Sequence, residues 1–182
     1  MSEFEFVFSL FGLLLGLSVA EVMGGMARVL KSRHRIRVGW QTPLLGLLVT
    51  IDLVTFWSLA WAGREQIPVK VLGLFAGCAI TAVYYLAASL TFPDELREGD
   101  DLDRHYEGHK RQVLGAVLVC NLATYALLAG VLGTVPIGVG FLVLMALYLV
   151  GLAAAILARG PRTNLALLAA LIFMNMVSAA FF

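Results

Sequence analysis

Six long runs of apolar residues, separated by short polar stretches, make up most of the chain. A membrane-spanning helix needs about 20 consecutive, mostly apolar residues. We expect helices of this kind over residues 4–30, 42–63, 69–92, 113–133, 136–158 and 163–182. Proline interrupts helices, and every proline lies at or near the end of a run: Pro43, Pro68, Pro93, Pro136 and Pro161. The pattern predicts an all-α integral membrane protein, one domain of six transmembrane helices joined by short loops.

The composition agrees with this pattern. Hydrophobic residues make up 60% of the chain and charged residues only 14%, with a mean hydropathy of +0.90. Soluble domains are nearer half apolar and a quarter charged. The net charge of +1, without a continuous basic face, argues against a nucleic-acid partner. We therefore expect a multi-pass protein of a bacterial inner membrane, with the lipid bilayer as its main partner.

Positive charge is concentrated in alternate connections. Basic residues in or beside the first, third and fifth connections are Arg28, Lys31, Arg33, Arg35, Arg37, Arg97, Arg104, Lys110, Arg111, Arg159 and Arg162. The second connection carries Arg64 and Lys70. Because basic residues stay in the cytoplasm, both termini should be non-cytoplasmic, and the acidic stretch 93–112 should form a cytoplasmic loop or interfacial helix. The N-terminal MSEFEF lacks the positive start of a secretory signal, so we expect the first run to remain as a helix.

Two carboxylates lie inside the apolar runs at a similar depth. Counted from the cytoplasmic ends, Glu21 and Asp52 are each about 15 Å deep, which is the middle of a hydrocarbon core about 30 Å thick. The same count places Asn121, Asn175 and Thr81 near this level. Further polar side chains follow within about a turn: Tyr84, Tyr85, Thr124 and Tyr125. Charged groups at this depth normally pair or line a wet cavity.

Arg28 offers one partner for these acids. It follows Glu21 by seven residues on the same helix face, and its side chain should lean back toward Glu21. An ion pair of Arg28 with Glu21 or Asp52 would serve only to hold helices together. However, one arginine cannot neutralise two carboxylates, so if both face one cavity, one of them is protonated or binds a cation.

Small residues recur every fourth position in the first run and place a strip on one helix face: Gly12, Gly16, Ala20 and Gly24. Such strips let another helix approach closely. The other helix belongs either to the same chain or to a homo-oligomer or membrane-protein partner, and the sequence leaves both open.

Other candidate chemistry is weaker. His105 and His109 are four residues apart, a spacing that can bind a divalent metal, but no third fixed ligand accompanies them. A solvated helix explains the same spacing. All three histidines lie in connections and no lysine lies deep in a run, so haem and retinal are disfavoured and no cofactor is expected. No nucleophile elbow, P-loop or zinc-protease motif is present, so we do not expect an enzyme, although the two acids leave an intramembrane enzyme open.

Two functional hypotheses remain. The first is a small channel or secondary transporter for protons or a small cation. In it Asp52 and Glu21 bind the ion, neutral side chains assist and Arg28 is the counter-charge; the assisting side chains are Asn121, Asn175 and Thr81. The second is a structural, accessory or sensor subunit whose acids pair with Arg28 and whose small-residue faces dock a partner. Whether water reaches the carboxylates distinguishes the two.

Overall fold

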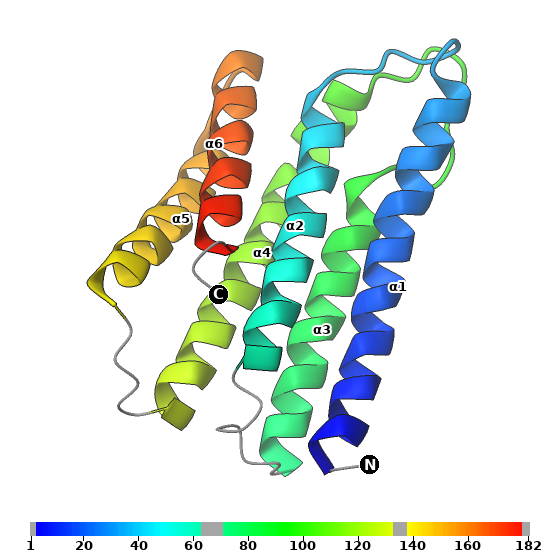
Figure 1. Cartoon of the computed structure of the whole chain (residues 1–182). Coiled ribbons are helices and arrows are strands. Elements are labelled where there is room, and N and C mark those ends of the chain that lie inside the picture. The colour runs from blue at the N-terminus through cyan, green and yellow to red at the C-terminus, as the bar shows by residue number, and fades with distance from the viewer. Residues whose placement is uncertain (1–2, 63–70, 133–137, 180–182) are drawn as a thin grey trace.

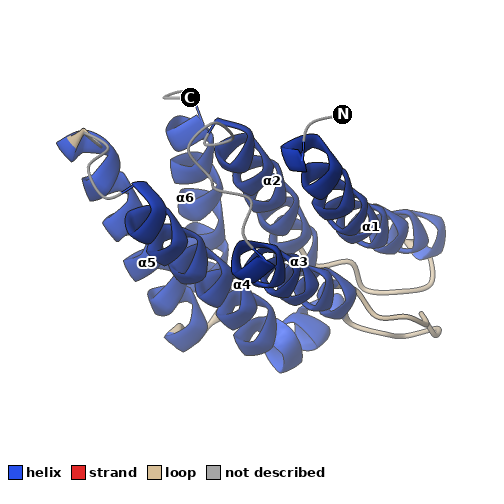
Figure 2. Cartoon of the chain, turned by 90° about the horizontal axis from the view of Figure 1, so that it is seen from below, coloured by secondary structure: helices blue, strands red, loops and turns tan. Residues whose placement is uncertain are grey.

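The computed structural model describes residues 3–62, 71–132 and 138–179, and in these ranges the chain forms an antiparallel helical bundle (Figures 1 and 2). The helices are α1 (Glu3–Ser32), α2 (Gln41–Ala62), α3 (Val71–Thr91), α4 (Leu102–Leu132), α5 (Val139–Leu157) and α6 (Pro161–Ala179). Five of these described helices, α1 to α5, are long and apolar enough to cross a membrane. The length and composition of these helices are consistent with a multi-pass membrane protein.

The predicted sixth span differs from the other five. It is a helix of 19 residues, but within its described residues it is not among the helices that are long and apolar enough to cross a membrane. Several predicted span ends, at 63, 69, 133, 136 and 182, lie outside the described residues, as do Arg64 and Lys70.

The acidic connection is shorter than the sequence pattern indicates. Helix α4 begins at Leu102, so residues 102–112 continue directly into the predicted fourth span. Asp101 explains this start, because its Oδ1 accepts a hydrogen bond from the backbone N–H of Asp103 at 2.9 Å. An aspartate in this position satisfies one of the free N–H groups at a helix start. Only the stretch from Phe92 to Asp101 connects α3 to α4.

The six helices form three consecutive hairpins, and their connections lie at the upper end of the bundle in Figure 1. We call this the loop end and the opposite end the far end. The connections α1–α2 and α3–α4 bind each other there, since the backbone N–H of Arg37 donates to the carbonyl of Asp100 at 2.8 Å. The hydroxyl of Thr42 donates to the carbonyl of Leu102 at 2.7 Å. These bonds fix the register of α2 against α4.

The second helix of each hairpin carries a buried stripe with the same spacing of four, three and four residues. The stripes are Gln41, Leu45, Leu48 and Asp52 in α2; Lys110, Leu114, Val117 and Asn121 in α4; and Asn164, Leu168, Leu171 and Asn175 in α6. This spacing keeps all four side chains on one helix face. Each stripe has a polar residue at both ends and apolar residues between them, and no member is more than 8% exposed.

The stripes build two buried polar layers. The central polar layer contains Asp52, Asn121 and Asn175, and the end polar layer, nearer the loop end, contains Gln41, Lys110 and Asn164. Eleven residues along a helix separate them, or about 16 Å. The structure thus has a threefold hairpin pattern. This pattern is hard to see in sequence because it rests on four positions per hairpin.

One close approach between helices lies near the loop end of α1, at Gly25. A Cβ atom added to Gly25 would lie 2.6 Å from Phe92, and one added to Gly46 of α2 would lie 2.8 Å from the same ring. The two glycines therefore make room for one aromatic side chain between α1, α2 and α3. The sequence-based strip does not include Gly25.

The predicted small-residue strip has mixed surroundings. Gly12 lies under the ring of Trp57, where an added Cβ would come within 2.6 Å. A Cβ atom added to Gly16 would meet no atom within 4 Å, and one added to Gly24 would meet only the side chain of Arg28, at 3.7 Å. Ala20 is exposed. Most of the strip thus faces outward from this chain.

Candidate functional site

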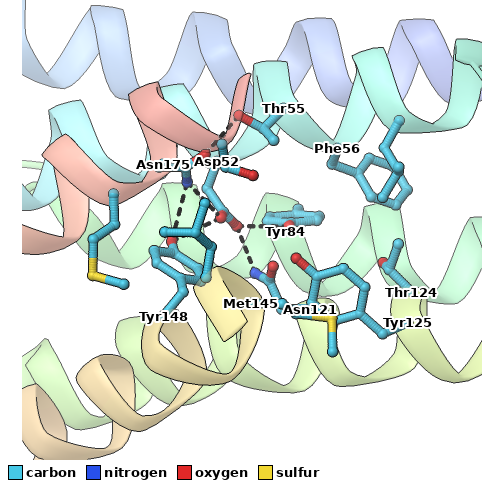
Figure 3. Close-up of a pocket in the computed structure, with 14 residues that line it drawn as sticks. Asp52, Thr55, Phe56, Tyr84, Asn121, Thr124, Tyr125, Met145, Tyr148 and Asn175 are labelled. Atoms are coloured by element: carbon cyan, nitrogen blue, oxygen red, sulfur yellow. Dashed lines mark hydrogen bonds between the residues drawn. The ribbon is translucent and has the colours of Figure 1, made fainter. Parts of the chain in front are cut away.

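The carboxylate of Asp52 is the centre of the most connected polar group in the bundle (Figure 3). Its Oδ2 accepts hydrogen bonds from the hydroxyl of Tyr84 at 2.7 Å and from Nδ2 of Asn121 at 2.9 Å. Its Oδ1 accepts from the hydroxyl of Tyr148 at 2.8 Å and from Nδ2 of Asn175 at 3.0 Å. The donors belong to α3, α4, α5 and α6, so five helices meet at one side chain that is 3% exposed.

The two amide donors have their orientation fixed by second contacts. Nδ2 of Asn121 also donates to the carbonyl of Val117 at 3.0 Å. Oδ1 of Asn175 accepts a hydrogen bond from the hydroxyl of Thr55 at 2.7 Å. Rotating either amide by 180° would place its Oδ1 against an oxygen of the Asp52 carboxylate, so both amide nitrogens point at Asp52. A tyrosine hydroxyl, by contrast, can donate or accept.

No cation balances this carboxylate within the described part of the chain. The hydrogen bonds and ion pairs of these residues connect Asp52 to no lysine, arginine or histidine. Four donors match the ionised form of a carboxylate, which only accepts hydrogen bonds. Burying an uncompensated charge is costly, and neutral donors offset only part of the cost. A positive charge would therefore be stabilised at Asp52.

A cavity of about 30 Å³ borders the carboxylate (Figure 3). A water molecule needs roughly 10–15 Å³ of such space, so about two or three molecules of that size fit. The cavity is lined by Asp52, Thr55, Phe56, Leu59, Tyr84, Asn121, Thr124, Tyr125, Leu144, Met145, Tyr148, Met174, Asn175 and Ser178. Hydroxyl groups and aromatic rings thus share the wall with the acid.

The structure brings several of the residues chosen by their depth in the sequence together around Asp52. Asn121, Asn175 and Tyr84 all bind Asp52, and Thr124 and Tyr125 line the cavity.

The structure places the other candidates elsewhere. Glu21 pairs with Arg28 at 3.6 Å, their side chains are 31% and 39% exposed, and neither lines the cavity of Asp52. Thr81 is buried, but its hydroxyl donates to carbonyls of its own helix. Tyr85 is 39% exposed. The side chains of these residues lie on other helix faces, because depth along the sequence does not fix the rotation of a helix about its axis.

Tyr148 is a donor to Asp52 that the sequence analysis misses. It lies nine residues before Leu157, the last residue of α5, and so about 14 Å from that helix end. The same depth count that finds Asn121 would have found it. Its phenol is easily overlooked in the apolar run 139–157.

A second buried charge, also absent from the sequence-based candidates, is Lys110 in the end polar layer. Its Nζ donates to the carbonyl of Ala158 at 2.7 Å and lies 2.8 Å from Oε2 of Glu107. Nδ2 of Asn164 donates to the other oxygen of Glu107 at 2.7 Å. Ala158 caps the C-terminus of α5, where a cation is favourable. Lys110 therefore joins α4 to both helices of the third hairpin.

The histidine pair predicted as a weak metal site is compact. The rings of His105 and His109 stack with centroids 4.2 Å apart. One ring nitrogen of His105 already contacts the carbonyl of Leu90, and one of His109 contacts the carbonyl of His105. Within residues 3–62, 71–132 and 138–179, no three His, Cys, Asp or Glu side chains gather in a way that could hold a metal ion.

Comparisons of the chain with known protein families, curated proteins and solved structures found no match. The side chains around Asp52 are therefore the strongest guide to function.

Proposed function

We propose that this protein is a small channel or secondary transporter for protons or a small cation, and that Asp52 is the ion-binding group. One observation carries the proposal. The carboxylate is buried, is held by four neutral donors from four helices, and borders a cavity. An acid at membrane depth without a cationic partner is a functional group by default.

The distribution of charge supports an orientation in the membrane. The basic residues of the first, third and fifth connections belong to the loop end of the bundle. In the proposed orientation this end faces the cytoplasm of a bacterium and the protein resides in the inner membrane. The cavity then lies on the non-cytoplasmic side of Asp52.

Ion flux into liposomes tests the proposal. The purified protein is reconstituted, gradients of protons, sodium or potassium are imposed, and wild type is compared with Asp52→Asn. Glu21→Gln is the matched control, because it neutralises the other acid at the same depth without touching the cavity. We expect flux above empty liposomes in wild type and Glu21→Gln, and none in Asp52→Asn. Absence of flux in wild type under every gradient would contradict transport.

A specific observation favours a second candidate, a structural, accessory or sensor subunit. Each oxygen of Asp52 already has two donors, so the carboxylate is also a hub that ties α2 to four other helices. If this is its main role, Asp52→Asn should lower the unfolding temperature strongly in a protein that conducts nothing. Capture of a partner by the outward-facing strip of α1 would then become the next measurement.

A further inference from the structure

The cavity lies mostly on one side of Asp52 along the helices that line it; Met174, one residue before Asn175 on α6, is an exception. On α2, α4 and α6, which run away from the loop end, the lining residues other than those bound to Asp52 mostly follow the central polar layer: Thr55, Phe56, Leu59, Thr124, Tyr125 and Ser178. On α5, which runs the opposite way, Leu144 and Met145 precede Tyr148. All of these positions lie toward the far end. The cavity therefore extends from the carboxylate toward the far end of the bundle.

Toward the loop end the same helices are packed with apolar side chains. Two apolar levels separate the polar layers: Leu45 and Leu48 in α2, Leu114 and Val117 in α4, and Leu168 and Leu171 in α6. Each of these side chains is at most 1% exposed. Moving a charge through this region would expose it to hydrocarbon for most of about 16 Å. Asp52 thus borders a cavity on one side and apolar packing on the other.

The donors around Asp52 discriminate between ions. Hard metal cations are held by six or more oxygen ligands in protein sites. Here the amides of Asn121 and Asn175 turn nitrogen, and not oxygen, toward the carboxylate. A proton needs only one lone pair of one oxygen. A cavity of about 30 Å³ is also in keeping with a proton delivered by a chain of water-sized molecules.

We propose that the ion bound at Asp52 is a proton and that it reaches the carboxylate from the far end of the bundle only. This inference rests on the proposed function and names its ion and its side of entry. A hydronium ion in the cavity transfers its proton to Oδ1 or Oδ2 and becomes water. The new carboxylic acid then donates a hydrogen bond to the oxygen of Tyr148 or Tyr84, whose own hydrogen turns away from the carboxyl group.

The groups that face Asp52 are compatible with this step. Titratable side chains near it in the described chain are Tyr84 of α3, Cys120 and Tyr125 of α4, and Tyr148 of α5. Helix α6 presents the amide of Asn175. All of these groups are neutral in their ordinary forms at pH 7. The incoming proton therefore meets one negative charge and no competing cation among them.

Thiol labelling tests the side of entry. Single cysteines are placed at Ser178 or Leu171, in a background with Cys78→Ser and Cys120→Ser. The two positions lie seven residues apart on α6, one in the cavity wall and one in the apolar region. An impermeant thiol reagent is applied to intact cells and to inverted membrane vesicles. We expect labelling of Ser178→Cys at least about tenfold faster than that of Leu171→Cys, and from one side only. Faster labelling of Leu171→Cys from the loop side would overturn one-sided entry.

Infrared difference spectroscopy tests the ion without requiring transport. Spectra of wild type and Asp52→Asn are compared between high and low pH, with and without sodium or potassium. Every acidic side chain of the protein gives a carboxylic-acid carbonyl band once it is protonated, so the readout is the difference between wild type and Asp52→Asn. We expect one component of the band to be present in acidified wild type, missing in Asp52→Asn and unchanged by either metal cation. Loss of this component on adding sodium or potassium, or identical bands in wild type and Asp52→Asn at every pH, would overturn the proton assignment. A band without flux in liposomes would overturn the proposed transport and leave the proton site standing.

Discussion

The hydroxyl oxygen of Tyr84 lies 2.7 Å from Oδ2 of Asp52, the shortest of the four contacts to this carboxylate. Both side chains are buried, and the bond joins α3 to α2 across the middle of the bundle. A hydrogen bond to a charged group is worth roughly 1.5–3 kcal/mol.

Replacing Tyr84 by phenylalanine should therefore reduce the free energy of unfolding by about 1.5–3 kcal/mol. Thermal unfolding in detergent, followed by circular dichroism, measures the change. Tyr85→Phe is the matched control, because the neighbouring ring is 39% exposed and its loss of a hydroxyl should cost less than about 0.5 kcal/mol. Equal effects of the two substitutions would contradict the assigned contact.

Replacing Lys110 by methionine should destabilise the loop end of the third hairpin. The change leaves the carbonyl of Ala158 and the amide oxygen of Asn164 without their donor, at a cost of about 1–3 kcal/mol for an unsatisfied buried group. Hydrogen exchange of the α5 and α6 amides reports the loss locally. Arg111→Met changes an exposed neighbouring position and should leave the exchange rates unchanged. If Arg111→Met accelerates exchange as much as Lys110→Met does, the buried role of Lys110 is wrong.

Gly25→Ala and Gly16→Ala should have opposite effects although both lie in α1. The new methyl group at Gly25 would lie 2.6 Å from Phe92, whereas the one at Gly16 meets nothing within 4 Å. Overpacking costs about 1–3 kcal/mol, while glycine to alanine in a free helix position gains about 0.5–1 kcal/mol. Unfolding midpoints of the two variants compare these directly. A stabilised Gly25→Ala variant would show that α1 does not approach Phe92 this closely.

Removal of divalent metals should leave the protein unchanged. The stacked pair of His105 and His109 already uses ring nitrogens on backbone carbonyls. We expect the same unfolding midpoint with zinc, without zinc and with a chelator, and the same result for His109→Ala. A midpoint that rises with zinc in wild type alone would establish a metal site at this pair.

The sequence predicts the helices and the depth of their polar residues, because hydropathy and a rise of about 1.5 Å per residue are sufficient for both. Asn121 and Asn175 are found in this way. Rotation about the helix axis is a property of packing, so Glu21 lies on another face, paired with Arg28. Lys110 is missed for a different reason. It lies in a charged stretch that reads as a connection, and only the start of α4 at Leu102 brings it inside the bundle.

The charges of the two polar layers are balanced differently. In the end polar layer Lys110 lies 2.8 Å from the carboxylate of Glu107, so its positive charge is compensated within one turn of the same helix. In the central polar layer the described chain bonds Asp52 to neutral donors alone. The unbalanced charge is therefore confined to one of the two layers, about 16 Å along the helices from the other. The three hairpins thus resemble one another in shape, but their unequal polar residues give the bundle an electrical direction.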